Sequence, residues 1–421
     1  MTSFSTKLSN IAARLMSNRN KIPTFLNVLI DDVAKRPDGI LARIVDSLLL
    51  ATQAAPVVTQ VPESSIRLFI GPTNYAGQGY AWSRALEASN PNLKACNLEI
   101  ELPGSFQFPA DSKVSISAYN RSGKWQRKEL EAVQSFTHVL YEAERPLFGS
   151  LFHRNLKKEV NALLSSEVSV ALICHGTDVR SPMKHVSLTE WSPYVDEVRL
   201  ATQHQKEVDT NLKLIADLQL PTFVSTPDLL LDLPEAQWCP VVVDTGVWLP
   251  AQEPLKKTRP VVAHIPSMGN IKGTHLIHDT LVSLDSEGLI EYQPLHGVPA
   301  FEMPKVIAAA DIVLDQFRIG SYGVAAVEAM STGRVVVGHV AQEVRSIVMS
   351  QTGRKLPVVE ATPSTLAKVL REICMNRDSF QKIARDGYEF ARAIHSGKYS
   401  AKVLETHWIA VAQEQPLEKD D

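Results

Sequence analysis

The sequence predicts an α/β protein with two Rossmann-like, doubly wound domains that face a cleft, preceded by a helical N-terminal extension. Apolar strands alternate with helical segments in two series, one starting at Ser65 and the other at Val261. Between them, residues 241–260 are rich in proline and polar side chains, which is typical of a linker. A chain of 421 residues is also too long for a single core. Continuous apolar strands alternating with helices indicate parallel sheets with helices on both faces.

The bulk composition excludes several classes of protein. Hydrophobic residues make up 44% and charged residues 21% of the chain, as in an ordinary globular protein. The net charge is −3 without a long basic run, so we expect no nucleic-acid partner. The four cysteines lie far apart without a C-x-x-C pair, so we expect neither a metal site nor a disulfide framework.

The N-terminal extension, residues 1–62, reads as helices without a strand. Its first 21 residues carry basic but no acidic side chains, with Leu8, Ile11 and Leu15 near helical spacing. This segment is interpreted as an accessory helix packed on the body, as a basic amphipathic helix at an anionic membrane, or as a weak targeting segment; the first is favoured. No apolar run reaches the roughly 18 residues of a membrane span, and no secretory signal is evident. We expect a cytoplasmic protein, with the amphipathic alternative placing it at the inner face of the membrane.

The elements of the two series follow from apolar runs and helical periodicity. Strands of the first series are expected at Ile66–Ile70, Lys113–Ala118, Phe136–Tyr141, Val168–Cys174 and Pro221–Ser225, with helices that include Phe152–Ser165 and Val198–Leu218. Strands of the second are expected at Val261–Ile265, Leu289–Gln293, Ile312–Leu314, Val335–Val337 and Pro357–Val359. Its helices are expected near Gly273–Leu284, Met303–Ala309, Gly323–Met330, Glu343–Ser350 and Ser364–Cys374, followed by helix over Asp378–Val411 with a break at Gly397. The predicted domains are therefore residues 63–250 and 251–395, followed by a C-terminal segment, 396–421, that ends in an acidic tail.

Two motifs of the first series lie where strands end. The loop after the first strand contains Gly77 and Gly79 and opens a helix whose amides can bind phosphate or sugar. A dinucleotide fingerprint needs a third glycine where Trp82 stands, so a tight strand–helix turn is an equal alternative. His175 follows a buried strand and points toward the expected cleft. Asp178 either caps the next segment, which is favoured, or accepts from an acceptor hydroxyl.

Two motifs of the second series indicate an anion site. Lys272 follows the first strand and precedes a helix, where an ammonium can neutralise a diphosphate. Gly320 and Gly323 allow a turn into a short apolar helix, so that Gly323 and Val324 present backbone N–H groups. Glu328 is the one acid inside this helix, and a ribose would suit it as a partner, because a carboxylate accepts hydrogen bonds from hydroxyls.

These motifs, in this order, resemble the retaining, nucleotide-sugar-dependent glycosyltransferases of the GT-B fold, specifically the "group 1" family. The resemblance covers roughly residues 65–413 and is strongest over 260–340. It implies that Glu328 holds the ribose hydroxyls of the donor, that Lys272 and the amides near Gly323 contact the diphosphate, and that His175 lies near the sugar and the acceptor. By the same resemblance Gly77 and Gly79 close over the donor, and the final helix crosses back to the first domain.

The chain departs from the family pattern at two positions. Gly320 stands where the family carries a glutamate that contacts the donor sugar, and Ser267 stands where it carries an arginine that supports the diphosphate. Arg318 is a candidate to restore that positive charge, with a structural role as the alternative.

The resemblance implies a metal-independent, hexosyltransferase-type enzyme, without a cofactor, that moves a sugar from a nucleoside-diphosphate donor to an acceptor hydroxyl with retention. The acceptor would be a glycan, a lipid-linked molecule or a small molecule. The alternative is a non-catalytic GT-B helper or glycan-binding protein, for which Gly320 and Ser267 are the reasons. An NAD-linked enzyme using the Gly77–Gly79 loop is a weaker third reading, because it leaves the motifs of the second series unexplained.

Overall fold

The computed structural model describes residues 56–102, 108–196, 198–250, 252–265, 272–295, 297–299 and 301–411. Most of the predicted N-terminal extension, the acidic tail and Ser267 lie outside the described residues. No helix within the described ranges is long and apolar enough to cross a membrane. The described chain divides into two compact units, one of residues 56–83 and 90–172 and one of residues 84–89 and 173–411. The domain boundaries expected from the sequence stay predictions.

The first sheet has seven strands in the order β3-β2-β1-β4-β5-β6-β7. Its described pairings are parallel, with Leu68 of β1 opposite both Ala95 of β2 and His138 of β4. The strands are β1 (Ile66–Gly71), β2 (Leu93–Glu101), β3 (Ser112–Ser115), β4 (His138–Glu142), β5 (Ser169–Cys174), β6 (Thr222–Val224) and β7 (Gln237–Trp238). Helices along this part are α4 (Gln78–Ser89), α5 (Ile116–Arg121), α6 (Gly123–Val133), α7 (Leu156–Leu164), α8 (Pro182–Leu188), α9 (Pro193–Asp196) and α10 (Val198–Leu218), with short helices η2 (Tyr75–Gly77) and η3 (Pro227–Leu231).

Three expectations for this sheet were wrong in detail, and the two-residue strand β7 is one of the strands that were missed. Strand β2 was missed because polar residues interrupt its apolar pattern. Its Asn97 is buried because it exchanges hydrogen bonds with Asp111, at 3.0 Å in both directions. The strand expected over Lys113–Ala118 ends at Ser115, whose side chain accepts from the Ala118 amide and starts α5.

The second sheet has five strands in the order β12-β11-β10-β8-β9, and its described pairings are also parallel. The strands are β8 (Val261–His264), β9 (Glu291–Pro294), β10 (Ile312–Leu314), β11 (Val335–Gly338) and β12 (Val359–Glu360), and the helices are α12 (Thr274–Ser286), α13 (Met303–Ala309), α14 (Val324–Ser331), α15 (Gln342–Thr352), α16 (Leu366–Met375) and α17 (Arg377–Ile394). The expected elements of this series are confirmed to within a few residues. In chain order the strands read 5-4-3-1-2, a doubly wound arrangement whose direction reverses between β8 and β10.

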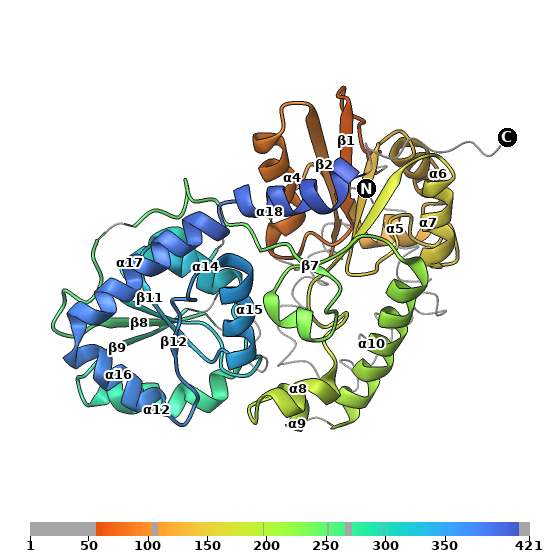
Figure 1. The fold of residues 1–421 in the computed structure, drawn as a ribbon. Helices are drawn as coiled ribbons and strands as arrows, with labels where there is room; N and C mark the ends of the chain where they lie inside the picture. The colour runs from red at the N-terminus through yellow and green to blue at the C-terminus, as the bar shows by residue number, and fades with distance from the viewer. Residues whose placement is uncertain are drawn as a thin grey trace, which may run out of the picture. The chain divides into compact units, whose positions relative to one another are not determined.

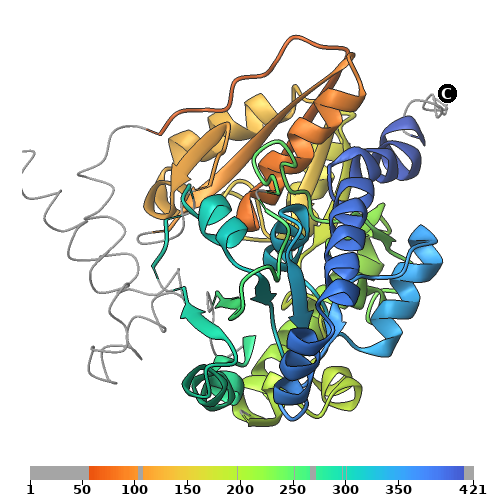
Figure 2. The same ribbon diagram turned by 90° about the vertical axis from the view of Figure 1, so that its left-hand side faces the viewer.

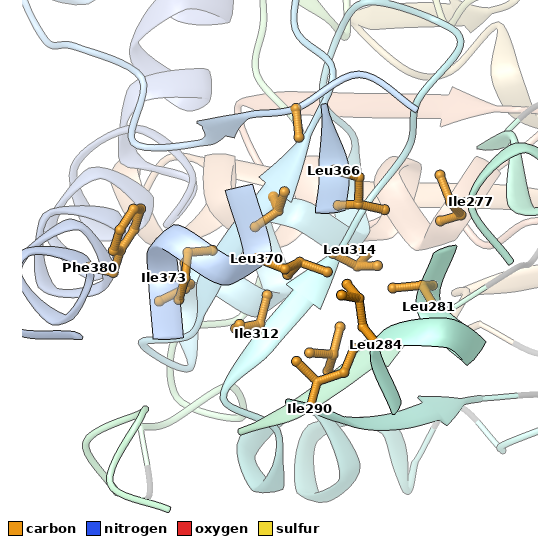
Figure 3. Packing of buried hydrophobic residues seen from close by; sticks show 14 of the residues in the cluster. Ile277, Leu281, Leu284, Ile290, Ile312, Leu314, Leu366, Leu370, Ile373 and Phe380 are labelled. Carbon is orange, nitrogen blue, oxygen red and sulfur yellow. The ribbon is translucent and has the colours of Figure 1, made fainter. Parts of the chain in front are cut away.

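Helices cover both faces of the second sheet (Figure 1). Helices α12 and α16 lie on one face, and α14 and α17 lie together on the other. Figure 2 shows α17, in blue, as one continuous helix. An apolar cluster lies between the sheet and the α12–α16 pair (Figure 3), and its members include Ile277, Leu281, Ile312, Leu314, Leu366, Leu370 and Ile373. This packing fixes the carboxyl ends of β8 and β10, where the candidate site lies.

The chain leaves this core through a break at Gly397, as expected. Gly397 has φ +97° and precedes α18 (Lys398–Leu404), which continues as η4 (Glu405–Ile409). This segment packs on the second half of α4, where Ser89 Oγ donates to Glu405 Oε1 at 3.0 Å. Ser400 Oγ also donates to the Pro240 carbonyl at 2.7 Å. Both of these contacts lie within the second unit.

Candidate functional site

The candidate site lies where the strand order of the second sheet reverses. Chains leaving β8 and β10 turn to opposite faces of the sheet there, which leaves a crevice at the carboxyl ends of the two strands. Lys272 comes from the connection after β8 and Asp315 immediately follows β10. Their segments are joined by the main chain, because the Phe317 amide donates to the Lys272 carbonyl at 2.9 Å.

Asp315 sits between the lysine and the start of helix α14. The Lys272 Nζ atom lies 3.8 Å from Asp315 Oδ1, and the Gly323 amide donates to Asp315 Oδ2 at 3.3 Å. The Asp315 side chain is almost fully buried, with 4% of it exposed. Burial raises the pKa of Asp315, and Lys272 and the Gly323 amide oppose that shift. The carboxylate therefore acts as an internal counter-ion for both predicted anion-binding groups.

The first turn of α14 presents unused backbone donors. Gly323 is the N-cap residue in an extended conformation, and the first intrahelical bond runs from the Val327 amide to the Gly323 carbonyl at 3.2 Å. The amides of Val324, Ala325 and Ala326 make no hydrogen bond with a described residue. Val324 and Ala325 are half-buried. A helix start with open N–H groups attracts anions.

Glu328 lies one turn further along the same helix. Its side chain is half-buried and makes no hydrogen bond or ion pair with a described residue. Burial raises the pKa of Glu328 to about 8, Lys272 lowers it and Asp315 raises it further. A half-buried glutamate with a pKa near neutrality can bind the hydroxyl groups of a ligand, because its protonated and its ionised forms both make hydrogen bonds with hydroxyls.

The arrangement combines one cation, a helix start and two acids around one crevice. Such a set can bind a phosphorylated molecule that also carries hydroxyls. The Lys272 ammonium lies against the Asp315 carboxylate and offsets its charge.

The first sheet reverses direction between β1 and β4, and its crevice is built differently. The amides of Thr73 and Asn74 both donate to Glu142 Oε2 at 2.8 Å, and the Tyr80 amide donates to Asn74 Oδ1 at 3.0 Å. Gly77 ends η2, and Gly79 lies in the first turn of α4, where a Cβ atom would stand 3.3 Å from Glu142 Oε1. Protein carboxylate and amide groups thus use several of the donors that the glycine loop was expected to offer.

His175 and Asp178 form one turn after β5. The amides of His175 and Gly176 donate to the Asp178 carboxylate at 2.7 and 2.5 Å. Asp178 thus closes this turn, and the next helix, α8, is capped instead by Ser181, whose side chain accepts from the Lys184 amide. His175 is half-buried at the carboxyl end of β5, and its role near a sugar stays a prediction.

Arg318 is held by the segment that contains α9. Its Nε and Nη2 atoms donate to the carbonyls of Trp191 and Ser192, each at 2.9 Å, and Nη2 also pairs with Asp196. The residue is 5% exposed, so the guanidinium lies inside the protein. A contact with a diphosphate would require these bonds to break, which favours the structural alternative for Arg318.

In the same loop, the backbone conformation favours glycine at position 320. Gly320 is buried and has φ +68°, a left-handed conformation that favours glycine. Its carbonyl accepts from the Ala341 amide at 2.9 Å, and a Cβ atom would stand 3.4 Å from the Ala341 Cβ. The glutamate expected from the family resemblance would therefore be strained at this position.

A separate cavity lies beside the loop after β11. It has a volume of about 840 Å³, and its lining includes His339, Arg345, Glu360 and Phe390. His339 bridges Thr189 and Glu360, at 2.9 and 2.7 Å. Lys272, Asp315 and Glu328 do not line this cavity, so it is distinct from the candidate site.

Sequence reasoning identified Lys272, Gly323, Val324 and Glu328, which the structure brings to one end of the second sheet. It missed Asp315 and Glu142. Both directly follow or end a buried strand next to a reversal point, and this position was the available signal. It also missed His185, which lies in a short helix without a recognisable motif.

Comparison with known protein families and with curated proteins gives no match. Solved structures are similar in fold. HepE from Anabaena, in complex with UDP and glucose, has a TM-score of 0.51 and 13% identity over 81% of this chain and 98% of its own. Sucrose-phosphate synthase from Thermosynechococcus elongatus has a TM-score of 0.51 and 12% identity over 81% and 97% of the two chains. The catalytic domain of starch synthase IV from Arabidopsis thaliana, bound to ADP and acarbose, has a TM-score of 0.51 and 10% identity over 84% and 100%.

The chain has the GT-B fold. Two doubly wound sheets, predicted from two strand–helix series, agree with this result. At identities of 10–13% these likenesses concern the fold alone. The function must therefore be argued from the residues of the site.

Proposed function

We propose that the protein is a glycosyltransferase that moves a sugar from a nucleoside-diphosphate donor to an acceptor hydroxyl, with retention at the anomeric carbon. One observation carries the proposal. At the reversal point of the second sheet, Lys272 and the open amides at the start of α14 stand beside Glu328. A diphosphate requires the first two groups and a ribose suits the third.

The chemistry that these residues can supply is electrostatic. The difficult step is departure of a nucleoside diphosphate while positive charge develops on the sugar ring. Lys272 and the amides of Val324 and Ala325 stabilise the negative charge that grows on the leaving phosphate, without a metal ion. The departing phosphate oxygen takes the acceptor proton, so that no protein side chain serves as the nucleophile. Glu328 holds the ribose hydroxyls.

The similar structures support the substrate class. HepE is described with UDP-glucose as well as with UDP and glucose, and starch synthase IV with ADP. A hexose donor is therefore the first choice for this chain. The acceptor is proposed only as a hydroxyl on a glycan, a lipid-linked molecule or a small molecule.

A second candidate, a GT-B protein without transferase activity, is favoured by one observation. Gly320 replaces the family glutamate in a conformation that disfavours any side chain, so a donor-sugar contact is absent from that position. Such a protein would bind a glycan or a partner enzyme.

The experiment that tests the proposal is a release assay. The purified protein is incubated with UDP-, GDP-, ADP- and TDP-hexoses, with and without mixed oligosaccharide and lipid-linked acceptors, and free nucleoside diphosphate is measured. We expect release from one donor class, with turnover reduced about 10²-fold in Lys272→Ala, the usual effect of losing one preorganised donor. Binding of a nucleoside diphosphate without release from any donor would favour the helper. An active Lys272→Ala variant would contradict the role of Lys272.

A further inference from the structure

Asp315 places a negative charge in the candidate diphosphate site, and the proposed function does not explain this charge. Its carboxylate contacts the two groups that should receive the diphosphate, the Lys272 ammonium and the Gly323 amide. The inference below rests on the proposed function and concerns the same site.

The geometry makes Asp315 an internal substitute for a phosphate. A phosphate at the start of α14 would take hydrogen bonds from the first amides and an ion pair from Lys272. Asp315 uses one oxygen for each of these two contacts, at 3.3 and 3.8 Å. The carboxylate therefore holds both groups in place when no anion is bound.

The same geometry opposes a bound diphosphate. With Lys272 charged and Asp315 and Glu328 ionised, the three side chains carry a net charge of about −1 before the ligand arrives. A diphosphate adds further negative charge within a partly desolvated crevice, where repulsion between like charges is stronger than in water. Neutralising one carboxylate would relieve this repulsion while Lys272 stays in place.

We propose that Asp315 is a positioning residue for Lys272 and the start of α14, and that a nucleoside diphosphate binds there with uptake of a proton by the Asp315–Glu328 carboxylate pair. The proton comes from the buffer, forms an O–H bond on one carboxylate oxygen, and returns to the buffer when the ligand leaves. We assign the proton to the two carboxylates together and not to one of them, because two interacting acids titrate together.

The charged groups around the pair come from three elements. Lys272 precedes α12, Asp315 follows β10 and Glu328 lies on α14, and these are the described ionisable groups that shift the pair. Burial raises the pKa of Asp315, and it raises the pKa of Glu328 to about 8. A carboxyl group of this kind can bind a proton near neutral pH, as the proposal requires.

The experiment is calorimetric titration of the full chain with UDP, ADP, GDP and TDP above neutral pH, where the ligands are fully ionised. Titration in two buffers with different ionisation enthalpies gives the number of protons taken up. We expect up to about one proton for the wild-type protein, and no more than about half of the wild-type uptake in Asp315→Asn and in Glu328→Gln. As pH rises, the wild-type Kd should increase by up to about tenfold per unit, with a shallower slope in Asp315→Asn.

Asp311→Asn is the matched control, because Asp311 is a buried acid at the opposite end of β10. It should keep the wild-type proton uptake, as a purely structural acid would. Binding without proton uptake, or wild-type uptake in Asp315→Asn, overturns the inference and leaves the proposed function standing. Failure of all four diphosphates to bind the wild-type protein contradicts the proposed function, and the inference falls with it.

Discussion

The Nε2 atom of His185 lies 2.9 Å from the carbonyl oxygen of Ile319, and its Nδ1 atom lies 2.8 Å from Ser192 Oγ. A carbonyl only accepts, so Nε2 carries the hydrogen, whereas the serine hydroxyl can donate to Nδ1 or accept from it. At neutral pH the ring is uncharged, because its pKa lies well below that pH. Burial lowers the pKa of His185 to about 4, with the Arg180 charge acting in the same direction. This bond ties the segment of α8 and α9 to the loop that leads into α14.

His185 should make stability depend on pH below neutrality. The pKa of His185 in the folded protein, about 4, is below its ordinary value of 6.5. The neutral ring therefore contributes to the free energy of unfolding above pH 6.5, and this contribution is lost as pH falls toward 4. The destabilisation caused by His185→Gln should therefore shrink by about 2–3 kcal/mol over this range. Urea unfolding across the range measures it, with the exposed His407→Gln as control. A destabilisation by His185→Gln that stays constant with pH would contradict the neutral-ring assignment.

Arg318 should contribute more to the stability of the fold than to the binding of a ligand. Arg318→Ala leaves the carbonyls of Trp191 and Ser192 without their buried donors. We expect a loss of about 2–4 kcal/mol in the free energy of unfolding, measured by urea denaturation.

Arg371→Ala is the comparison for this prediction, because Arg371 forms an ion pair with Glu287 in which both side chains are more than 40% exposed. It should cost much less than Arg318→Ala, because exposed ion pairs contribute little to stability. Equal effects of the two substitutions would show that the Arg318 bonds contribute little.

Glu328 should destabilise the folded protein at alkaline pH. A carboxyl group whose pKa is raised from 4.5 to about 8 favours the fold while protonated, and that advantage is lost as pH rises through this interval. Glu328→Gln should therefore be about 1–3 kcal/mol more stable than the wild type above pH 8, after allowance for partial exposure, with a smaller difference near pH 5. Unfolding at both pH values tests this, with the exposed Glu235→Gln as control. A pH-independent difference would mean that Glu328 is solvated.

Gly320 should reject a side chain for reasons of backbone conformation. At φ +68°, Gly320→Ala should cost about 1 kcal/mol or more, and Gly320→Glu should not create the family's sugar contact. Gly123 begins α6 without a left-handed backbone, so Gly123→Ala should be neutral or stabilising. Thermal unfolding of the two alanine variants shows whether each substitution lowers or raises the stability. A Gly320→Ala variant as stable as the wild type would show that the loop can change its backbone.

The fold was largely predictable because apolar strands and helical periodicity are local signals. Strands β8, β10 and β11 and helices α13 and α10 are found as expected. The strands are short apolar runs buried along their whole length, as parallel strands covered on both faces require, and the helices follow the helical period. Strand β2 was missed because Asn97 and Glu99 are buried through bonds to residues distant in sequence, Asp111 and Asn74.

The candidate site could be predicted only in part for a similar reason. Lys272 and Glu328 lie in sequence motifs whose residues have a known chemical role, so the sequence identifies them. Asp315 has no motif, and its importance depends on the distance to Lys272 and on the Gly323 amide, which only the folded chain defines. The role of Arg318 likewise depends on carbonyls more than a hundred positions away in the sequence.

The most direct test of the central claim is the affinity of UDP, ADP, GDP and TDP for the wild-type protein and for Lys272→Met, measured by calorimetry at neutral pH. The exposed Lys355→Met serves as the control for loss of a positive charge. We expect at least one diphosphate to bind the wild-type protein and Lys355→Met equally, and to bind Lys272→Met about 10- to 100-fold more weakly, the effect of losing one charge-assisted contact. Absence of binding by all four, or equal affinity of the wild type and Lys272→Met, would contradict the claim that Lys272 and the start of α14 hold a diphosphate.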